Sequence, residues 1–169
     1  MTQQFDLSKF SEFKLRVNVN TGIENAYRAW ASSAGVSSWF LRATYKDQQG
    51  KFRSGDELAQ EGDEYALSFT TNPEMVICTG KVLKANGRDL FCFSFSKGCP
   101  VTISIYQEQD ETIIQLIESH LPTDEDTIRK HFIGDTKGWI FYLTNLKSVL
   151  EGGLDLRNKN AALKSVITQ

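Results

Sequence analysis

Residues that could carry out catalysis or bind a metal are few in this chain of 169 residues. Its two histidines are His120, at the end of an expected strand, and His131, in the first half of an expected helix. They could approach each other across a gap between sheet and helix. A metal site needs several ligands in matched geometry, and the sequence places no further ligand beside them. We therefore interpret both as ordinary histidines and expect neither a metal nor another cofactor.

The three cysteines, Cys78, Cys92 and Cys99, are the next candidates. A nucleophilic cysteine needs a neighbouring base or positive charge that lowers its pKa, and no histidine partner is evident for any of them. They also lack the C-x-x-C spacing of a metal or redox site, and their odd number argues against a disulfide framework. Reduced structural thiols are the favoured interpretation.

An acidic stretch contains Glu57, Glu61, Asp63 and Glu64. A pair of carboxylates can act as general acid and base, but a solvated acidic loop is the commoner outcome of such a run. The sequence contains neither G-x-S-x-G nor H-E-x-x-H nor a phosphate-binding glycine loop. We therefore predict no catalytic residues and a protein that is not an enzyme. A lone acid or histidine acting in a cavity is the weakest alternative.

Aromatic side chains give the strongest signal, with 11 phenylalanines and three tryptophans. Some must form the core, since burying one such ring contributes about 1.5–3 kcal/mol. Others could line a pocket for an apolar ligand, because such pockets are mostly apolar with a few polar groups. The candidate ligand-binding residues are Trp39, Phe40, Phe69, Phe95, His120, Phe132, Trp139 and Leu143.

The elements that would position these residues begin with a strand from Phe13 to Asn20, in which apolar and polar residues alternate. Thr21 and Glu24 then have the spacing of a capping box, which predicts a helix from Ile23 to Ala31. A second short helix is expected from Val36 to Phe40. Residues 41–119 alternate short apolar runs with turn residues, which predicts an antiparallel meander.

Helical spacing returns near the C-terminus, where apolar residues follow one face from Ile128 to Leu150. Thr123 is the expected N-cap, with acidic residues in the first turn at the positive end of the helix dipole. Gly152 is the expected stop. Gly134 and Gly138, inside the helix, indicate a kink or a site of close approach.

This order predicts an α+β helix-grip fold: a curved antiparallel sheet, two short helices after the first strand, and a long C-terminal helix over the sheet. Two local patterns carry a resemblance. One runs from Val17 to Trp30 and is followed by Ser38-Trp39-Phe40, and the other joins Gly138-Trp139 to Leu150-Glu151-Gly152. They resemble the START-like superfamily (SRPBCC, Bet v-type). More narrowly, they are similar to the domain family of homologues of the activator of the heat-shock-protein-90 ATPase.

The resemblance covers residues 11–153, which we expect to form a single domain. Residues 1–10 would then be an N-terminal extension and residues 154–169 a polar, mobile tail. The resemblance implies the helix-grip fold without implying one activity, because members bind lipids, sterols and aromatic metabolites, and some catalyse cyclisations. Our leading hypothesis is a non-enzymatic domain that holds a small hydrophobic or amphipathic ligand between sheet and helix. The alternative is a protein-interaction module related to heat-shock-protein-90 co-chaperones, acting in the stress response with a chaperone as partner.

Composition argues against other classes of partner. Lys plus Arg number 19 and Asp plus Glu 21, a net charge of -2 that gives no field to attract nucleic acid or an anionic membrane. No stretch approaches the roughly 20 apolar residues of a membrane span, and residues 1–10 do not have the pattern of a signal peptide. We therefore expect a cytoplasmic monomer with no nucleic-acid or membrane partner.

Overall fold

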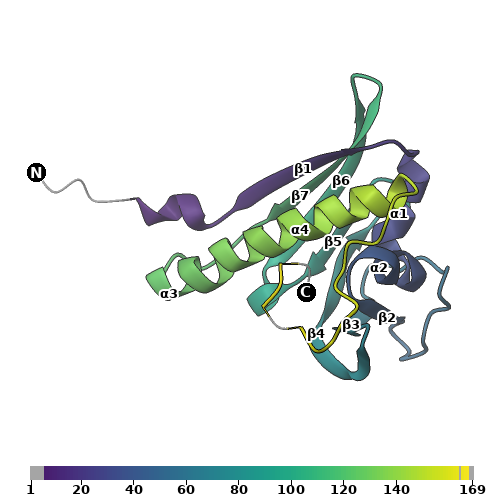
Figure 1. Cartoon of the computed structure of the whole chain (residues 1–169), viewed down its shortest axis with the longest axis horizontal. Coiled ribbons are helices and arrows are strands. Elements are labelled where there is room, and N and C mark those ends of the chain that lie inside the picture. Colours follow the sequence, from purple (N-terminus) through teal and green to yellow (C-terminus); the bar gives the residue numbers. More distant parts are fainter. Residues whose placement is uncertain (1–5, 164, 168–169) are drawn as a thin grey trace, which may run out of the picture.

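The computed structural model describes residues 6–163 and 165–167, so residues 1–5 of the expected extension and residues 164, 168 and 169 of the expected tail lie outside it. Seven strands form one antiparallel sheet in the order β1-β7-β6-β5-β4-β3-β2 (Figure 1). The strands are β1 (Phe13–Val19), β2 (Arg42–Lys46), β3 (Glu64–Phe69), β4 (Asn72–Ala85), β5 (Leu90–Ser94), β6 (Pro100–Glu108) and β7 (Glu111–Glu118). The helices are η1 (Leu7–Phe10), α1 (Ile23–Ala31), α2 (Ser33–Trp39), η2 (Ser96–Gly98), α3 (Glu125–Thr127), the π-helical η3 (Ile128–Phe132) and α4 (Ile133–Leu150).

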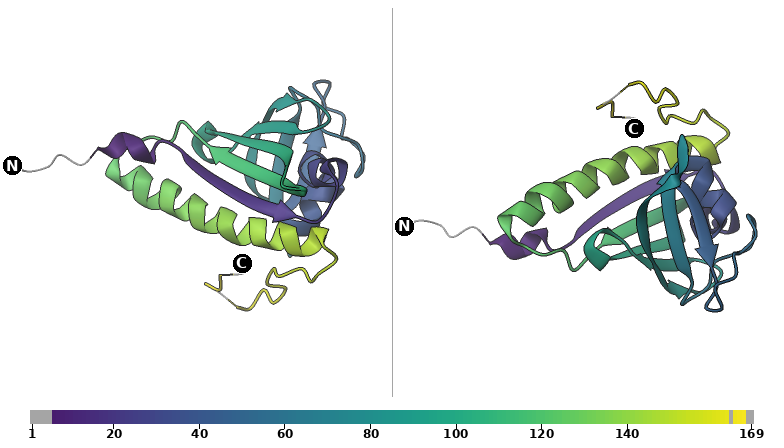
Figure 2. Two further views of the ribbon diagram at one scale, coloured as in Figure 1. Left: turned by 90° about the horizontal axis from the view of Figure 1, so that it is seen from above. Right: turned by 90° about the horizontal axis from the view of Figure 1, so that it is seen from below.

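The long helix α4 runs alongside β1 (Figures 1 and 2). The short helices α1 and α2 lie at the end where α4 terminates, and η1 and α3 lie at the opposite end. The sheet curls so that its inner face packs against α1, α2 and α4. This arrangement confirms the predicted α+β helix-grip fold.

Local sequence determined most element boundaries, but the two predicted N-caps, Thr21 and Thr123, were wrong. Helix α1 has the predicted bounds, but Gly22 occupies its N-cap position and makes no side-chain capping bond. Thr21 instead accepts a hydrogen bond from the Asn25 amide at 3.3 Å. Helix α2 begins earlier than predicted, because the Ser32 hydroxyl accepts from the Gly35 N–H at 3.0 Å and caps it.

The C-terminal helix differs from its prediction at the start and in the middle. Its N-cap is Asp124, whose carboxylate accepts from the Thr127 N–H at 2.9 Å, and not Thr123. The irregularity lies in the π-helical η3 and not at the two interior glycines. A Cβ added at Gly134 or Gly138 would meet no described atom within 4 Å, so neither marks a close approach. The predicted stop is confirmed, since Gly152 has a φ of +75°.

The chain that follows α4 turns back along it (Figure 2) and is hydrogen-bonded to α2 and α4. The Arg157 guanidinium donates to three backbone oxygens at the C-terminal end of α2, those of Ser37 (3.0 Å), Ser38 (2.9 Å) and Phe40 (2.7 Å). Asn145 is fully buried in α4; it donates to the Trp39 carbonyl and accepts from the Leu156 N–H, both at 2.7 Å. Mobility from residue 154 onward stays a prediction, and these bonds oppose it over its first residues.

Replacing Asn145 by Ala is expected to lower the free energy of unfolding by about 2–3 kcal/mol, because it leaves the buried Trp39 carbonyl unpaired and removes the bonds that hold the returning chain. Urea denaturation measures the loss, and amide hydrogen exchange at residues 154–158 should speed up in parallel. Asn25→Ala, on the exposed surface of α1, is the matched control and should change stability by less than about 0.5 kcal/mol. Equal effects of the two substitutions would contradict the assignment.

None of the helices in the described part of the chain is long and apolar enough to cross a membrane.

Candidate functional site

Several of the predicted ligand-binding residues form one aromatic cluster between the sheet and α4. Phe40 stacks on Trp39 with ring centroids 5.3 Å apart and on Trp139 at 5.1 Å. Phe95 lies 5.2 Å from Trp139 on the sheet side. Leu143, one turn after Trp139, is buried in the same core. The structure therefore brings together five of the eight candidates: Trp39, Phe40, Phe95, Trp139 and Leu143.

The other three candidates lie elsewhere. Phe69 is partly exposed at the end of β3. Phe132 packs edge-on against Phe10 at 5.0 Å and Phe13 at 5.5 Å, at the N-terminal end of the long helix. His120 is exposed in the segment after β7, with a φ of +59°. The sequence assigned these side chains to their elements without showing how far along the helix or strand each one lies, so their part in ligand binding stays a prediction.

A cavity of about 20 Å³ remains inside the aromatic cluster. Its wall includes Trp30, Val36, Trp39, Phe40, Tyr45 and Phe93. This volume holds about one water molecule. The rings themselves therefore fill most of the space in which the sequence placed a ligand.

Trp30 brings an unused polar atom to the wall of this cavity. Its indole N–H is buried and has no hydrogen-bond partner among the residues that the structure describes. The indole N–H of Trp39, by contrast, donates to the Ala29 carbonyl at 2.8 Å. An unpaired buried donor costs about 1–3 kcal/mol, so an acceptor atom that reached Trp30 would be bound favourably.

An outer groove of about 420 Å³ opens next to the cluster, between the β3–β4 hairpin, α4 and the returning C-terminal chain. Its walls include Phe40, Leu41, Phe69, Met75, Tyr142 and Arg157. This size and the mixture of apolar rings with a few polar groups are typical of small-molecule sites. Phe40 lines both the inner cavity and the outer groove, so its ring separates the two.

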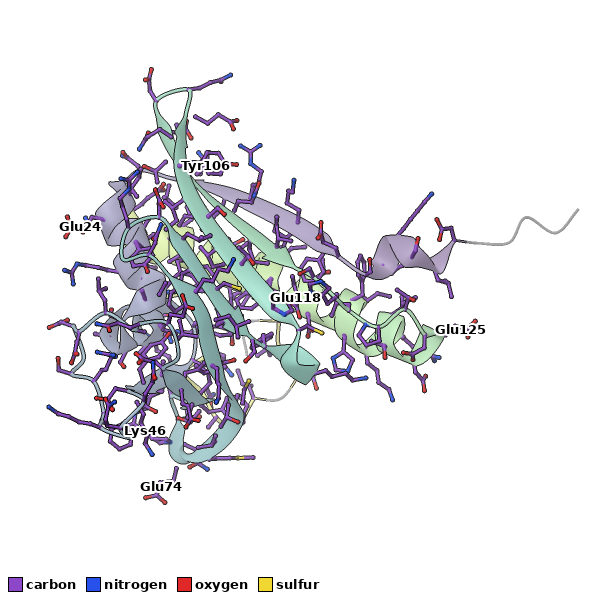
Figure 3. All side chains as sticks on the ribbon, turned by 180° about the vertical axis from the view of Figure 1, so that it is seen from behind. Glu24, Lys46, Glu74, Tyr106, Glu118 and Glu125 are labelled. Carbon is purple, nitrogen blue, oxygen red and sulfur yellow. The ribbon has the colours of Figure 1, made fainter. Side chains whose placement is uncertain are left out.

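A second feature, which the sequence analysis missed, is a buried acid at the end of β7. Glu118 is 0% exposed and accepts a hydrogen bond from the Trp139 indole N–H at 2.9 Å. Figure 3 shows Glu118 in the middle of the molecule, beside the long helix, whereas Glu74 and Glu125 lie at the periphery. The alternation of β7 is the signal that could have located it, because Glu118 shares a strand face with the buried Ile114 and Leu116.

Glu118 lies against Asp135 of α4, and burial controls the ionisation of both. Burial raises the pKa of Glu118 to about 8, and the adjacent negative charge of Asp135 contributes, while the Trp139 N–H opposes the change. Burial also raises the pKa of Asp135, against the opposing effects of the neighbouring His131, Glu118 and Ser96 side chains. Burial and the proximity of the two groups therefore both favour the protonated form over a pair of charged carboxylates.

Ser96, His131 and Asp135 have the residue types of a catalytic triad but not its geometry. The Ser96 hydroxyl lies 2.7 Å from His131 Nδ1. Asp135 Oδ2 lies 3.9 Å from the same ring nitrogen. In a triad the base contacts the nucleophile through one nitrogen and the acid through the other, so this arrangement does not pass a proton from serine to aspartate through the ring.

The cysteines and the possible metal ligands lie in surroundings that do not favour chemistry. Cys92 and Cys99 are buried, Cys78 is half-buried, and burial raises the pKa of the Cys78 and Cys99 thiols, which keeps them protonated. Across residues 6–163 and 165–167, no group of three or more histidine, cysteine or acidic side chains could hold a metal ion.

Asp63 corrects the prediction of a solvated acidic loop. It is 1% exposed, and Arg53 binds both of its carboxylate oxygens through Nε and through a second guanidinium nitrogen at 3.0 Å. The Gln60 N–H donates to the same carboxylate at 2.8 Å. Asp63 therefore forms a buried, structural ion pair with Arg53 and is not part of a solvated loop.

No protein-family model matches the sequence, and neither does any curated protein sequence. Solved structures do resemble it. A Staphylococcus saprophyticus protein aligns with a TM-score of 0.67 at 16% identity, over 86% of this chain and 96% of its own. The Aha1 dimer from Colwellia psychrerythraea aligns with a TM-score of 0.63 at 18% identity, and the alignment covers 84% of this chain and 97% of the Aha1 chain. DynU16, from the dynemicin biosynthetic locus, aligns with a TM-score of 0.58 at 16% identity, and the alignment covers 86% of this chain and 50% of DynU16.

The sequence identities of 16–18% are too low to indicate a shared activity. The structures nevertheless share one architecture. Each of these neighbours matches between 84% and 86% of the chain. The chain therefore has the START-like, Aha1-like helix-grip fold that its sequence patterns predicted.

Proposed function

We propose that this protein is a non-enzymatic binding domain for a small, flat, hydrophobic molecule that carries one hydrogen-bond acceptor. The observation that carries the proposal is the buried, unpaired indole N–H of Trp30 in the wall of a cavity made largely of aromatic rings. The ligand enters from the outer groove, displaces the Phe40 ring and places its acceptor at Trp30. Binding without catalysis is favoured because Ser96 and His131, which are in contact near the cluster, lack the geometry of a catalytic triad.

Two features of the groove support this route. Its volume of about 420 Å³ falls in the range of small-molecule sites, whereas the inner cavity alone is too small. Phe40 lines both spaces, and its ring is held by stacking on Trp39 and Trp139 and by an edge contact to Tyr142, with ring centroids 4.5 Å apart. A planar ligand that takes the place of this ring would keep the same stacking surfaces.

Two probes of equal size test the role of Trp30: 2-naphthaldehyde, which has a carbonyl acceptor, and 2-methylnaphthalene, which has none. The aldehyde is expected to bind the wild-type protein about fivefold more tightly, since one hydrogen bond contributes about 1 kcal/mol. Trp30→Phe should remove that preference and leave binding of the hydrocarbon unchanged. Titrations follow the indole N–H resonances of the three tryptophans in the ¹⁵N-labelled protein.

Phe40→Ala and Phe52→Ala provide the matched pair for the entry route. Opening the barrier at Phe40 should strengthen binding of both probes, whereas Phe52 lies outside the groove, is 59% exposed and should have no effect. If neither probe shifts any tryptophan resonance in a saturable way, with or without the Phe40 ring, the binding proposal is wrong.

A second candidate function, a protein-interaction module, is favoured by the exposed apolar run on β4. Met75, Val76 and Ile77 are 55%, 54% and 39% exposed, and adjacent exposed apolar residues often mark a docking surface. One structural neighbour is named as Aha1, so heat-shock protein 90 is the partner to test. Stimulation of its ATPase by the wild-type chain, lost in Val76→Ser, would support this candidate; no stimulation and no co-sedimentation would reject it.

A further inference from the structure

Glu118 and Asp135 each present a buried carboxylate oxygen that has no hydrogen-bond partner within residues 6–163 and 165–167. The atoms are Glu118 Oε1, at the end of β7, and Asp135 Oδ2, in the first turn of α4. Two ionised carboxylates cannot satisfy each other, because each only accepts hydrogen bonds. A carboxylic acid also donates one, so a single proton between the two groups would pair both atoms.

We propose that Glu118 and Asp135 share one proton, and that this proton fastens the start of the C-terminal helix to the end of the sheet. Glu118 Oε1 carries the proton and donates to Asp135 Oδ2. When the proton leaves at mildly alkaline pH, two negative charges face each other inside the protein. The segment from α3 to Gly138 then separates from β7 and takes Trp139 with it.

The surroundings of Glu118 make the doubly charged state unfavourable. Its other oxygen receives one N–H, from Trp139 at 2.9 Å. No ion pair among the described residues reaches Glu118, and the basic group near the pair is His131, whose Nδ1 lies 3.9 Å from Asp135 Oδ2. Like charges in a site with little water repel strongly, because the low dielectric weakens their screening.

The titratable groups near the pair come from four other parts of the chain. They are His131 in η3, Lys97 in η2, Cys99 just after η2, and Tyr65 in β3. A protonated His131 would hold Asp135 in its charged form, and the proton would then stay on Glu118. The Lys97 ammonium donates to the Thr127 hydroxyl at 3.2 Å. Burial keeps the Cys99 thiol and the Tyr65 phenol neutral by raising the pKa of each.

The helix start is built to move more easily than the rest of α4. The π-helical η3 interrupts regular hydrogen bonding before α4, and such turns often occur at functional positions. Gly134 and Gly138 follow, with open space where a side chain would be. Glycine lowers the cost of leaving the helical conformation, so one lost contact at Asp135 can release this short segment.

Trp139 connects the Glu118–Asp135 pair to the aromatic cluster. Its ring centroid lies 5.1 Å from that of Phe40 and 5.9 Å from that of Trp30. Deprotonation is therefore expected to loosen the walls of the cavity. The inference does not require that a ligand binds there, and its test uses none. A failure of the pH experiment leaves the binding proposal standing, and a failure of the ligand titrations leaves this one standing.

The experiment follows the Trp139 indole N–H resonance of the full ¹⁵N-labelled chain from pH 5 to 10, assigned with Trp139→Phe. The wild-type resonance should titrate with a midpoint above pH 7. Amide exchange at residues 128–138, corrected for its intrinsic pH dependence, should accelerate at least about tenfold through the same midpoint. In Glu118→Gln both changes should vanish, because the amide donates to Asp135 and accepts from Trp139 at every pH. Glu125→Gln, at the exposed start of α3, should behave as wild type.

A flat Trp139 resonance in the wild-type protein, or an unchanged midpoint in Glu118→Gln, would overturn the proposal. If Glu118→Gln does not fold, side-chain carboxyl ¹³C shifts of the wild-type protein decide the question. One proton held by the pair at pH 6.5 supports it, and two ionised carboxyls at that pH reject it.

Discussion

Glu118→Gln is expected to flatten the pH dependence of stability between about pH 5 and 8. In the wild-type protein, burial raises the pKa of Glu118 from its ordinary value of 4.5 to about 8. Between these values the folded state holds a proton that the unfolded chain has released. The free energy of unfolding therefore falls as pH rises, by up to about 1.4 kcal/mol per pH unit, and levels off above the folded-state pKa. Glutamine carries no such proton, so the variant lacks this slope.

Urea denaturation at a series of pH values from 5 to 9 measures the effect. The stability of Glu118→Gln relative to wild type should increase steadily up to about pH 8 and then level off, with a total change of several kcal/mol at most. Glu125→Gln removes an exposed carboxylate from the same part of the chain and should give a profile parallel to that of wild type. Parallel profiles for Glu118→Gln and wild type would show that Glu118 is ionised in the folded state.

Asp63→Ala is expected to lower the free energy of unfolding by about 3–5 kcal/mol, the usual cost of breaking one side of a buried ion pair. Asp63 is 1% exposed, and Arg53, whose side chain is 10% exposed, would lose its two-point partner. The Gln60 N–H would lose its acceptor as well. Thermal or urea unfolding at pH 7 measures the loss.

Glu57→Ala is the matched control, because Glu57 bonds the same guanidinium from a side chain that is 49% exposed. Exposed ion pairs contribute about 0–1 kcal/mol, so the control should lose no more than that. A loss at Asp63 as small as the loss at Glu57 would mean that the loop from Arg53 to Asp63 is solvated after all.

The fold followed from features that are local in sequence. Alternation of apolar and polar residues identified β1 as a strand, because side chains on one face of a strand repeat every second residue. Residues Ile23–Ala31 formed the predicted helix α1, and Gly152 ended the long helix, because spacing and glycine chemistry act within a few residues. The order of these elements then left few ways to cover one face of a sheet with one long helix.

The ligand-binding candidates were predictable only in part. The aromatic residues of α2 and α4 could be identified from helical spacing, and Trp39, Phe40, Trp139 and Leu143 do share one core. The sequence could not show that these rings would fill the enclosed space to about 20 Å³, or that Phe40 would separate an inner cavity from an outer groove. Cavity size depends on how side chains from distant segments pack together.

The sequence by itself therefore determined the type and order of the elements, since hydrophobic periodicity and turn residues are read from neighbouring positions. The tertiary structure alone decided which polar residues became buried. Glu118 and Asp135 are separated along the chain by a turn and the start of a helix, and Arg53 and Asp63 by a loop, yet each pair meets in the fold. The ionisation of such groups depends on the partner and on the loss of water around them, and both arise only when distant segments pack together in the folded chain.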